Sequence, residues 1–164
     1  MSGGYSSPPC YASEVAPDYF GTVPALTRDE LLVLLCRLLA AEQAGAAAAA
    51  AFANDCGRDS AAWKRFAALR GGGKKNCVIL AALIARLDGD AGRRAADDVP
   101  GSVQAVQGLR ARLEFINCGQ RRLAHAIHDA LPNIEQDFVR RALIGMEDSH
   151  LLDIEACEAL IETL

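Results

Sequence analysis

The chain has 164 residues, of which 51% are hydrophobic and only 5% aromatic, a length that fits one domain with a real core and is short for two. Its net charge of −4 comes from interleaved acidic and basic residues, which argues against nucleic-acid binding, because that needs a basic face. Six cysteines stand singly, without a Cys-x-x-Cys pair, so we expect reduced thiols rather than a disulfide framework. Without a signal peptide or a bilayer-length apolar stretch, a cytoplasmic protein with no membrane partner is expected.

The first segment, residues 1–26, is rich in Gly, Ser, Pro and Tyr and shows no apolar periodicity. It predicts a flexible, poorly ordered N-terminal arm, followed by one domain over residues 27–164. Thr27 with Glu30 three residues later is a capping-box pattern ahead of an apolar run, which predicts that the first helix starts here. This helix is expected to end near Asn54 to Gly57.

A second helical segment is predicted from about Asp59 or Ser60 to about Leu87. Gly71-Gly72-Gly73 interrupts it, and each glycine inside a helix costs about 1 kcal/mol relative to alanine. We therefore expect a kink or local melting at this point. A polar stretch over residues 88–101, with Gly and Pro, reads as a linker.

Two further amphipathic helices complete the chain. The third is predicted from just after Ser102 to about Leu131, and the fourth follows a corner at Pro132-Asn133 and runs to the end. Abundant alanine and scarce β-branched residues favour helix throughout. Four long helices of matched length predict an all-α four-helix bundle, up-down-down-up, in which residues 88–101 carry the crossover.

Ionisable residues on the apolar seams of these helices are the candidate site. Glu42 lies among leucines in the first helix, Glu114 lies midway along the third, and Glu147 and His150 lie midway along the fourth. Residues three apart share a helix face, so one helix can offer both Glu147 and His150. Carboxylate and imidazole are metal ligands, and a metal offsets the cost of burying an unpaired carboxylate.

Three stretches carry a family resemblance: KKNCVILAALI, LEFINCGQRRLAHAIHDALP and MEDSHLLDIEAC. Through them, and over about residues 27–162, the chain resembles ferritin-like proteins and is most similar to an uncharacterised bacterial ferritin-like family. The resemblance implies a dimetal-carboxylate site with one Glu from each of two helices and Glu-x-x-His from each of the other two. It also implies iron or manganese as cofactor, with oxygen or peroxide chemistry.

The chain departs from that pattern in its second helix, where Gly73 and Asn76 stand at the positions of Glu-x-x-His. We therefore expect a partly degraded site that holds at most one metal firmly, whereas catalysis and any small-molecule substrate are left open. The predicted metal ligands are Glu42, Glu114, Glu147 and His150.

Each predicted ligand has a structural alternative. Glu42 could instead form a buried hydrogen bond or an ion pair with Arg110 or Arg121, Glu114 could belong to a solvated polar stripe, and His150 could be a satisfied histidine at the core edge. The competing function is a non-catalytic bundle that has lost its metal. It would act as an interaction module, as a homodimer through an exposed apolar helix face.

Three other residues with ligand chemistry are assigned to packing or to the surface. Cys77, next to Asn76, is expected to be a packed core thiol. His125 and His128 are spaced like a ligand pair, but they lie near the end of the third helix among polar neighbours. We expect both to be surface residues.

Overall fold

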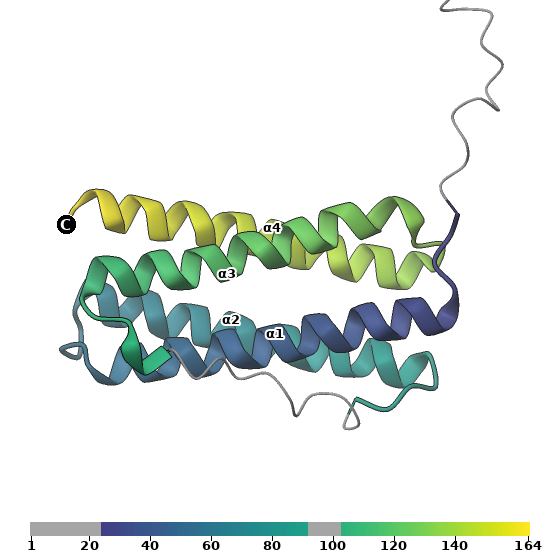
Figure 1. Cartoon of the computed structure of the whole chain (residues 1–164), viewed down its shortest axis with the longest axis horizontal. Helices are drawn as coiled ribbons and strands as arrows, with labels where there is room; N and C mark the ends of the chain where they lie inside the picture. The colour runs from purple at the N-terminus through teal and green to yellow at the C-terminus, as the bar shows by residue number, and fades with distance from the viewer. Residues whose placement is uncertain (1–23, 92–102) are drawn as a thin grey trace, which may run out of the picture.

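The computed structural model describes residues 24–91 and 103–164. Over these residues the fold is the predicted all-α four-helix bundle (Figure 1). Its elements are α1 (Arg28–Asn54), α2 (Ala61–Arg86), a 3-10 turn η3 (Val103–Ala105), α3 (Leu109–Ala130), a 3-10 turn η4 (Leu131–Asn133) and α4 (Asp137–Glu162). Most of the predicted N-terminal arm, residues 1–23, lies outside the described residues.

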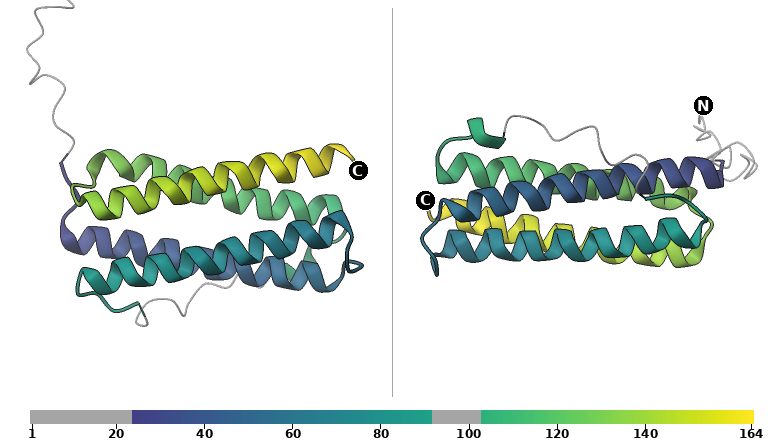
Figure 2. Two further views of the ribbon diagram at one scale, coloured as in Figure 1. Left: turned by 180° about the vertical axis from the view of Figure 1, so that it is seen from behind. Right: turned by 90° about the horizontal axis from the view of Figure 1, so that it is seen from below.

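The four helices form two antiparallel hairpins. α1 packs along α2 and α3 packs along α4, while α1 also contacts α3 and α2 also contacts α4. Figures 1 and 2 show α1 and α4 running in one direction and α2 and α3 in the other, which confirms the up-down-down-up order. The connection from α2 to α3 therefore joins opposite ends of the bundle, and residues 92–102 of it lie outside the described part.

The start of α1 confirms the predicted capping box. The Thr27 hydroxyl accepts from the backbone N–H of Glu30 at 3.3 Å, and the Glu30 carboxylate accepts from the backbone N–H of Thr27 at 2.9 Å. The backbone N–H of Thr27 and its hydroxyl both donate to the Glu30 carboxylate, and these two hydrogen bonds hold the pKa of Glu30 below its ordinary value. Just before the cap, the backbone N–H of Leu26 donates to the carbonyl of Asn133 at 2.7 Å, so the entry to α1 is joined to the α3–α4 corner.

The start of α3 differs from the prediction. The helix begins at Leu109 rather than just after Ser102, because Gly108 has φ = 85°, a left-handed conformation that an α-helix does not contain. Of the predicted first turns of this helix, the described residues 103–108 form the short turn η3 and a connecting segment. Arg112 stabilises the connecting segment by donating from Nε to the carbonyl of Val106 at 3.1 Å.

The predicted kink at Gly71-Gly72-Gly73 is wrong, because α2 is one continuous helix through all three glycines (Figure 2). Gly73 is buried against α1, and a Cβ added to it would lie 3.1 Å from the Cβ of Ala46. The absent side chain lets the two helices approach closely at this level. Packing against α1 and α4 therefore overrides the low helix propensity of the glycines.

The apolar core consists of two clusters, one toward each end of the bundle. The first apolar cluster lies beside η4 and is formed mainly by leucine and isoleucine side chains: Leu31, Leu35, Leu38, Leu39, Leu80, Leu83, Ile84, Leu123, Ile127, Ile134, Val139, Leu143 and Met146. The second apolar cluster contains smaller and aromatic side chains: Ala48, Ala49, Phe52, Ala62, Phe66, Leu69, Leu113, Ile116 and Cys157.

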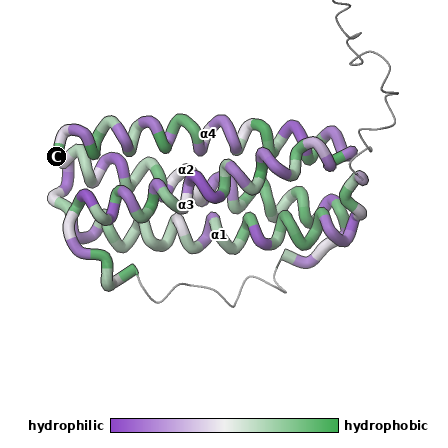
Figure 3. The backbone as a smooth tube through the Cα atoms, turned by 45° about the horizontal axis from the view of Figure 1, so that its top comes forward, coloured by the Kyte–Doolittle hydropathy of each residue, from purple (hydrophilic) through white to green (hydrophobic). Residues whose placement is uncertain are grey.

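α1 is the most apolar of the four helices, as Figure 3 shows. Within the described residues it is the one helix long and apolar enough, by length and composition, to cross a membrane, so the expectation that the chain has no apolar stretch of bilayer length is wrong for this segment. A core helix of a bundle meets the same criteria, and here the buried side of α1 contributes to both apolar clusters.

A buried polar layer as the candidate functional site

Polar side chains separate the two apolar clusters. Within the described residues, the buried polar or charged side chains are Glu42, Asn76, Asn117, Gln120 and His150, each at most 9% exposed. We call these five residues the polar layer. Every helix contributes to it: Glu42 comes from α1, Asn76 from α2, Asn117 and Gln120 from α3, and His150 from α4. On each helix the polar residue lies between residues of the first and second apolar clusters.

A chain of contacts joins the four helices through this layer. Asn76 donates from Nδ2 to Oε1 of Glu42 at 2.9 Å. Nε2 of His150 lies 2.9 Å from the same oxygen, and Nδ1 of His150 forms a hydrogen bond with Oε1 of Gln120. Buried polar groups are costly without partners, so this chain offsets much of the cost of placing them in the core.

The His150–Glu42 contact is close in distance but poorly aligned. Although Nε2 is within ion-pair distance of the carboxylate, its geometry does not meet the directional requirement for a hydrogen bond, and Nε2 has no other partner among the described residues. Distance establishes that the two groups touch, whereas direction governs the strength of a hydrogen bond. Oδ1 of Asn117 is likewise buried without a hydrogen-bond partner. The layer is therefore incompletely satisfied.

Cys77 lies beside this layer, packed against the first apolar cluster. Burial raises the pKa of its thiol, and the negative charge of Glu42 raises it further. A thiolate is the form of cysteine that binds metals. The surroundings of Cys77 disfavour that form, in agreement with the predicted role as a core thiol.

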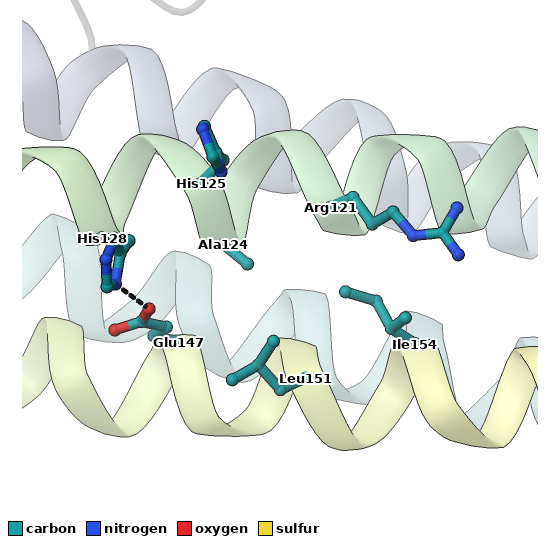
Figure 4. Close-up of a pocket in the computed structure, with 7 residues that line it drawn as sticks. All are labelled: Arg121, Ala124, His125, His128, Glu147, Leu151 and Ile154. Atoms are coloured by element: carbon teal, nitrogen blue, oxygen red, sulfur yellow. Dashed lines mark hydrogen bonds and ion pairs between the residues drawn. The ribbon is translucent and has the colours of Figure 1, made fainter.

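The four predicted ligands do not converge. Glu42 and His150 meet in the polar layer, but Glu114 is a surface residue whose side chain is 57% exposed and lies 3.9 Å from Arg110. Glu147 turns toward α3, where its Oε1 lies 2.9 Å from Nδ1 of His128 (Figure 4). Nowhere in residues 24–91 and 103–164 do three or more His, Cys, Asp or Glu side chains group in a way that could hold a metal ion.

Helix geometry explains the separation of Glu147 from His150. Three residues fall about 60° short of a full helical turn, which is enough to aim His150 into the core and Glu147 toward the neighbouring helix. Glu147 there lines a shallow groove between α3 and α4, together with Arg121, Ala124, His125, His128, Leu151 and Ile154. Figure 4 shows His125 pointing away from α4; both His125 and His128 are largely exposed, as predicted.

The alternative ion pair of Glu42 with an arginine is wrong. Arg110 lies beside Glu114, and Arg121 pairs with Glu158 on α4. Glu42 does accept a buried hydrogen bond, but its donor is Asn76, a partner that was not predicted. Asn117 and Gln120 of α3, which complete the layer, were not predicted as members of the site; neutral amides between charged residues do not stand out from a solvated helix face.

Fold and site together define a four-helix bundle whose core is divided by a buried polar layer. Residues 29–159 match a family described as "Domain of unknown function (DUF6306)", and the chain belongs to this family. Neither the curated proteins nor the solved structures give a match to the chain.

Proposed function

We propose that this bundle binds a single divalent metal ion in the polar layer, with Glu42 and His150 as its ionisable ligands. The observation that carries the proposal is Nε2 of His150, a buried nitrogen without a hydrogen-bond partner that faces a carboxylate oxygen 2.9 Å away. If Nδ1 donates to the carbonyl oxygen of Gln120, the lone pair of Nε2 stays free beside the Glu42 carboxylate. Two such acceptors need a cation between them, either a proton or a metal ion.

The arrangement of His150 also fits a metal ligand. Histidine ligands commonly donate their second ring N–H to an oxygen acceptor that fixes the ring, which is the role that Gln120 has here. The 2.9 Å between Nε2 and the Glu42 oxygen is short enough for both atoms to bind one ion at ligand distances of about 2.0–2.2 Å. One imidazole, one carboxylate and neighbouring amide oxygens suit iron, manganese or zinc.

The proposal is limited to one ion. A dimetal centre does not fit, because Glu114 lies on the surface and Glu147 pairs with His128. The amides of Asn76 and Asn117 are the remaining oxygen donors of the layer, and neither carries the charge that a second cation would need. A bound transition metal supplies Lewis acidity or redox chemistry; the chain's own residues would hold and orient it and exclude water.

A second candidate, a metal-free structural or interaction module, is favoured by the contacts of Glu42. Its Oε1 already accepts from Asn76 and touches His150, so a proton shared with His150 could complete the layer without a metal. The layer would then serve only to fix how the helices pair, a role attested for buried polar residues in other helical assemblies.

Metal content separates the two candidates. Protein from cells supplied with iron, manganese and zinc should carry close to one metal ion per chain, measured by elemental analysis after gel filtration. Glu42→Gln and His150→Gln should lose this ion, whereas the matched controls Glu114→Gln and Glu147→Gln should keep it. A chelator should also lower the melting temperature of the wild type, because a ligand that binds only the folded state stabilises it.

Two outcomes would contradict metal binding. Wild-type protein free of metal, with melting unchanged by chelator, favours the structural module. Equal metal loss in Glu114→Gln and in Glu42→Gln would place the ion elsewhere. Circular dichroism of every variant distinguishes the loss of a ligand from the loss of the fold.

A further inference from the structure

Large apolar side chains are exposed on one stripe of α4. The exposed large hydrophobic residues of the described chain are Val33, Val78, Ile144, Leu151, Leu152 and Leu164. Two of them, Ile144 and Leu152, lie eight residues apart on the outer face of α4, because residues seven or eight apart lie close together on a helix surface. Leu151, 47% exposed, lies beside them at the edge of the α3–α4 groove. The buried residues of α4, among them His150 and Cys157, lie on the opposite side of the helix, so this face is directed away from the bundle core; Figure 1 shows α4 at the edge of the bundle.

Charged residues flank these apolar side chains, with a positive charge at one end of the helix face and a negative charge at the other. Arg141 lies on the same exposed face before them and Glu155 lies on it after them, with Asp148 midway between. We call Arg141, Ile144, Asp148, Leu151, Leu152 and Glu155 the α4 outer stripe. Arg141 also pairs with Asp137 one turn earlier, while no ion pair of Glu155 is found among the described residues.

This distribution is self-complementary under a two-fold rotation. If a second α4 lies antiparallel across the first, Arg141 of each copy faces Glu155 of the other, and Ile144 of each faces the leucines of the other. A parallel arrangement would instead bring Arg141 against Arg141. Gly145 lies beside the stripe, exposed and with no atom within 4 Å of an added Cβ, so it leaves room for a close helix crossing.

We infer that the α4 outer stripe binds a second copy of this chain as an antiparallel, two-fold symmetric homodimer contact. Such isologous contacts are the commonest form of protein self-association. Burial of Ile144, Leu151 and Leu152 supplies the apolar contact, and the two Arg141–Glu155 pairs set the direction. The inference is independent of metal binding, because none of these side chains belongs to the polar layer.

The contact is small, and the dimer is therefore concentration-dependent. From Arg141 to Glu155 the helix extends about 21 Å at 1.5 Å per residue, less than an interface of about 800 Å² per partner would span. Asp148 faces its own copy at the centre of the contact, and this repulsion weakens it further. Removing that charge should therefore strengthen the dimer.

Sedimentation analysis of the full chain over a range of concentrations tests the inference. The wild type should show a monomer–dimer equilibrium, and Leu152→Glu should be monomeric. The Leu152 side chain is 67% exposed, so this variant should fold normally. The control is Val78→Glu on α2, whose valine is 71% exposed and whose substitution should leave the equilibrium unchanged. Asp148→Asn should lower the dissociation constant.

A charge swap tests the direction of the contact. Arg141→Glu and Glu155→Arg should each raise the dissociation constant by about tenfold, equivalent to about 1.4 kcal/mol, and the double variant should restore it. A wild type that is monomeric at every concentration overturns the inference. So does a dimer that survives Leu152→Glu, or a double variant as weak as the single ones.

Discussion

Replacing Glu42 by leucine tests whether the polar layer is held together as a unit. The substitution removes the acceptor of the Asn76 amide and the carboxylate beside Nε2 of His150, so two buried polar atoms lose their polar neighbour while Nδ1 of His150 keeps its bond to Gln120. Each such group costs about 1–3 kcal/mol, so the free energy of unfolding should fall by about 2–6 kcal/mol.

The double variant Glu42→Leu/His150→Leu sharpens the prediction. His150→Leu alone should also destabilise, because it removes the partner of Gln120 and leaves the Glu42 carboxylate with Asn76 alone. In the double variant both polar side chains are gone, and two leucines add apolar contact between the clusters. The double variant should lose less free energy of unfolding than the two single variants together, by about 2–3 kcal/mol, which is within the range found for residues in contact.

Urea unfolding at neutral pH in the presence of chelator measures these free energies without a metal contribution. The surface variant Glu114→Leu is the control for loss of a glutamate, and should change stability by no more than about 0.5 kcal/mol. The reasoning would be refuted if the two single losses added within about 0.5 kcal/mol, because independent sites behave in that way.

Three further predictions concern other parts of the bundle. Gly71 has open space around it, so Gly71→Ala should gain about 1 kcal/mol of stability. Gly73→Ala should be less stable than Gly71→Ala by about 1–3 kcal/mol, because the added Cβ crowds Ala46. Equal melting temperatures of the two variants would contradict the close approach of α1 and α2. The lowered pKa of Glu30 contributes stability that is present above the ordinary value of 4.5 and is lost as pH falls through the folded-state pKa. Glu30→Gln should therefore weaken the acid dependence of the free energy of unfolding. Identical acid profiles of variant and wild type would argue against the capping box. Burial raises the pKa of Cys157, so this thiol should be alkylated more slowly than the exposed Cys118. Peptide mass spectrometry measures both rates, and similar rates would indicate frequent opening of the second apolar cluster.

The fold follows from patterns that local physics can interpret. The apolar periodicity of the four segments and the Thr27–Glu30 cap locate the helices, because both depend on residues close in sequence. Two predictions about the helices are wrong, the kink at Gly71-Gly72-Gly73 and the start of α3, and their causes are tertiary packing and backbone conformation. Gly73 remains helical because α1 packs against it, and α3 begins late because Gly108 adopts a positive φ.

The site was harder to predict, because its members are set by rotation about each helix axis. Glu42 and His150 could be found, since both interrupt apolar seams that must face the core. Glu147 lies one turn from His150 yet faces α3, a difference that spacing in the sequence does not resolve. Asn117 and Gln120 were detectable as buried residues, because they share the seam of Leu113, Ile116 and Leu123.

The division of the core by the polar layer constrains how the helices can slide. Each of them passes from leucine-rich to alanine- and phenylalanine-rich surroundings through a single hydrophilic level. Axial slippage of one helix by a full turn, about 5.4 Å, would push its amide, carboxylate or imidazole into hydrocarbon and strand its former neighbours. The five residues of the polar layer thus favour one axial alignment of the four helices, whose apolar faces alone would not distinguish it from others.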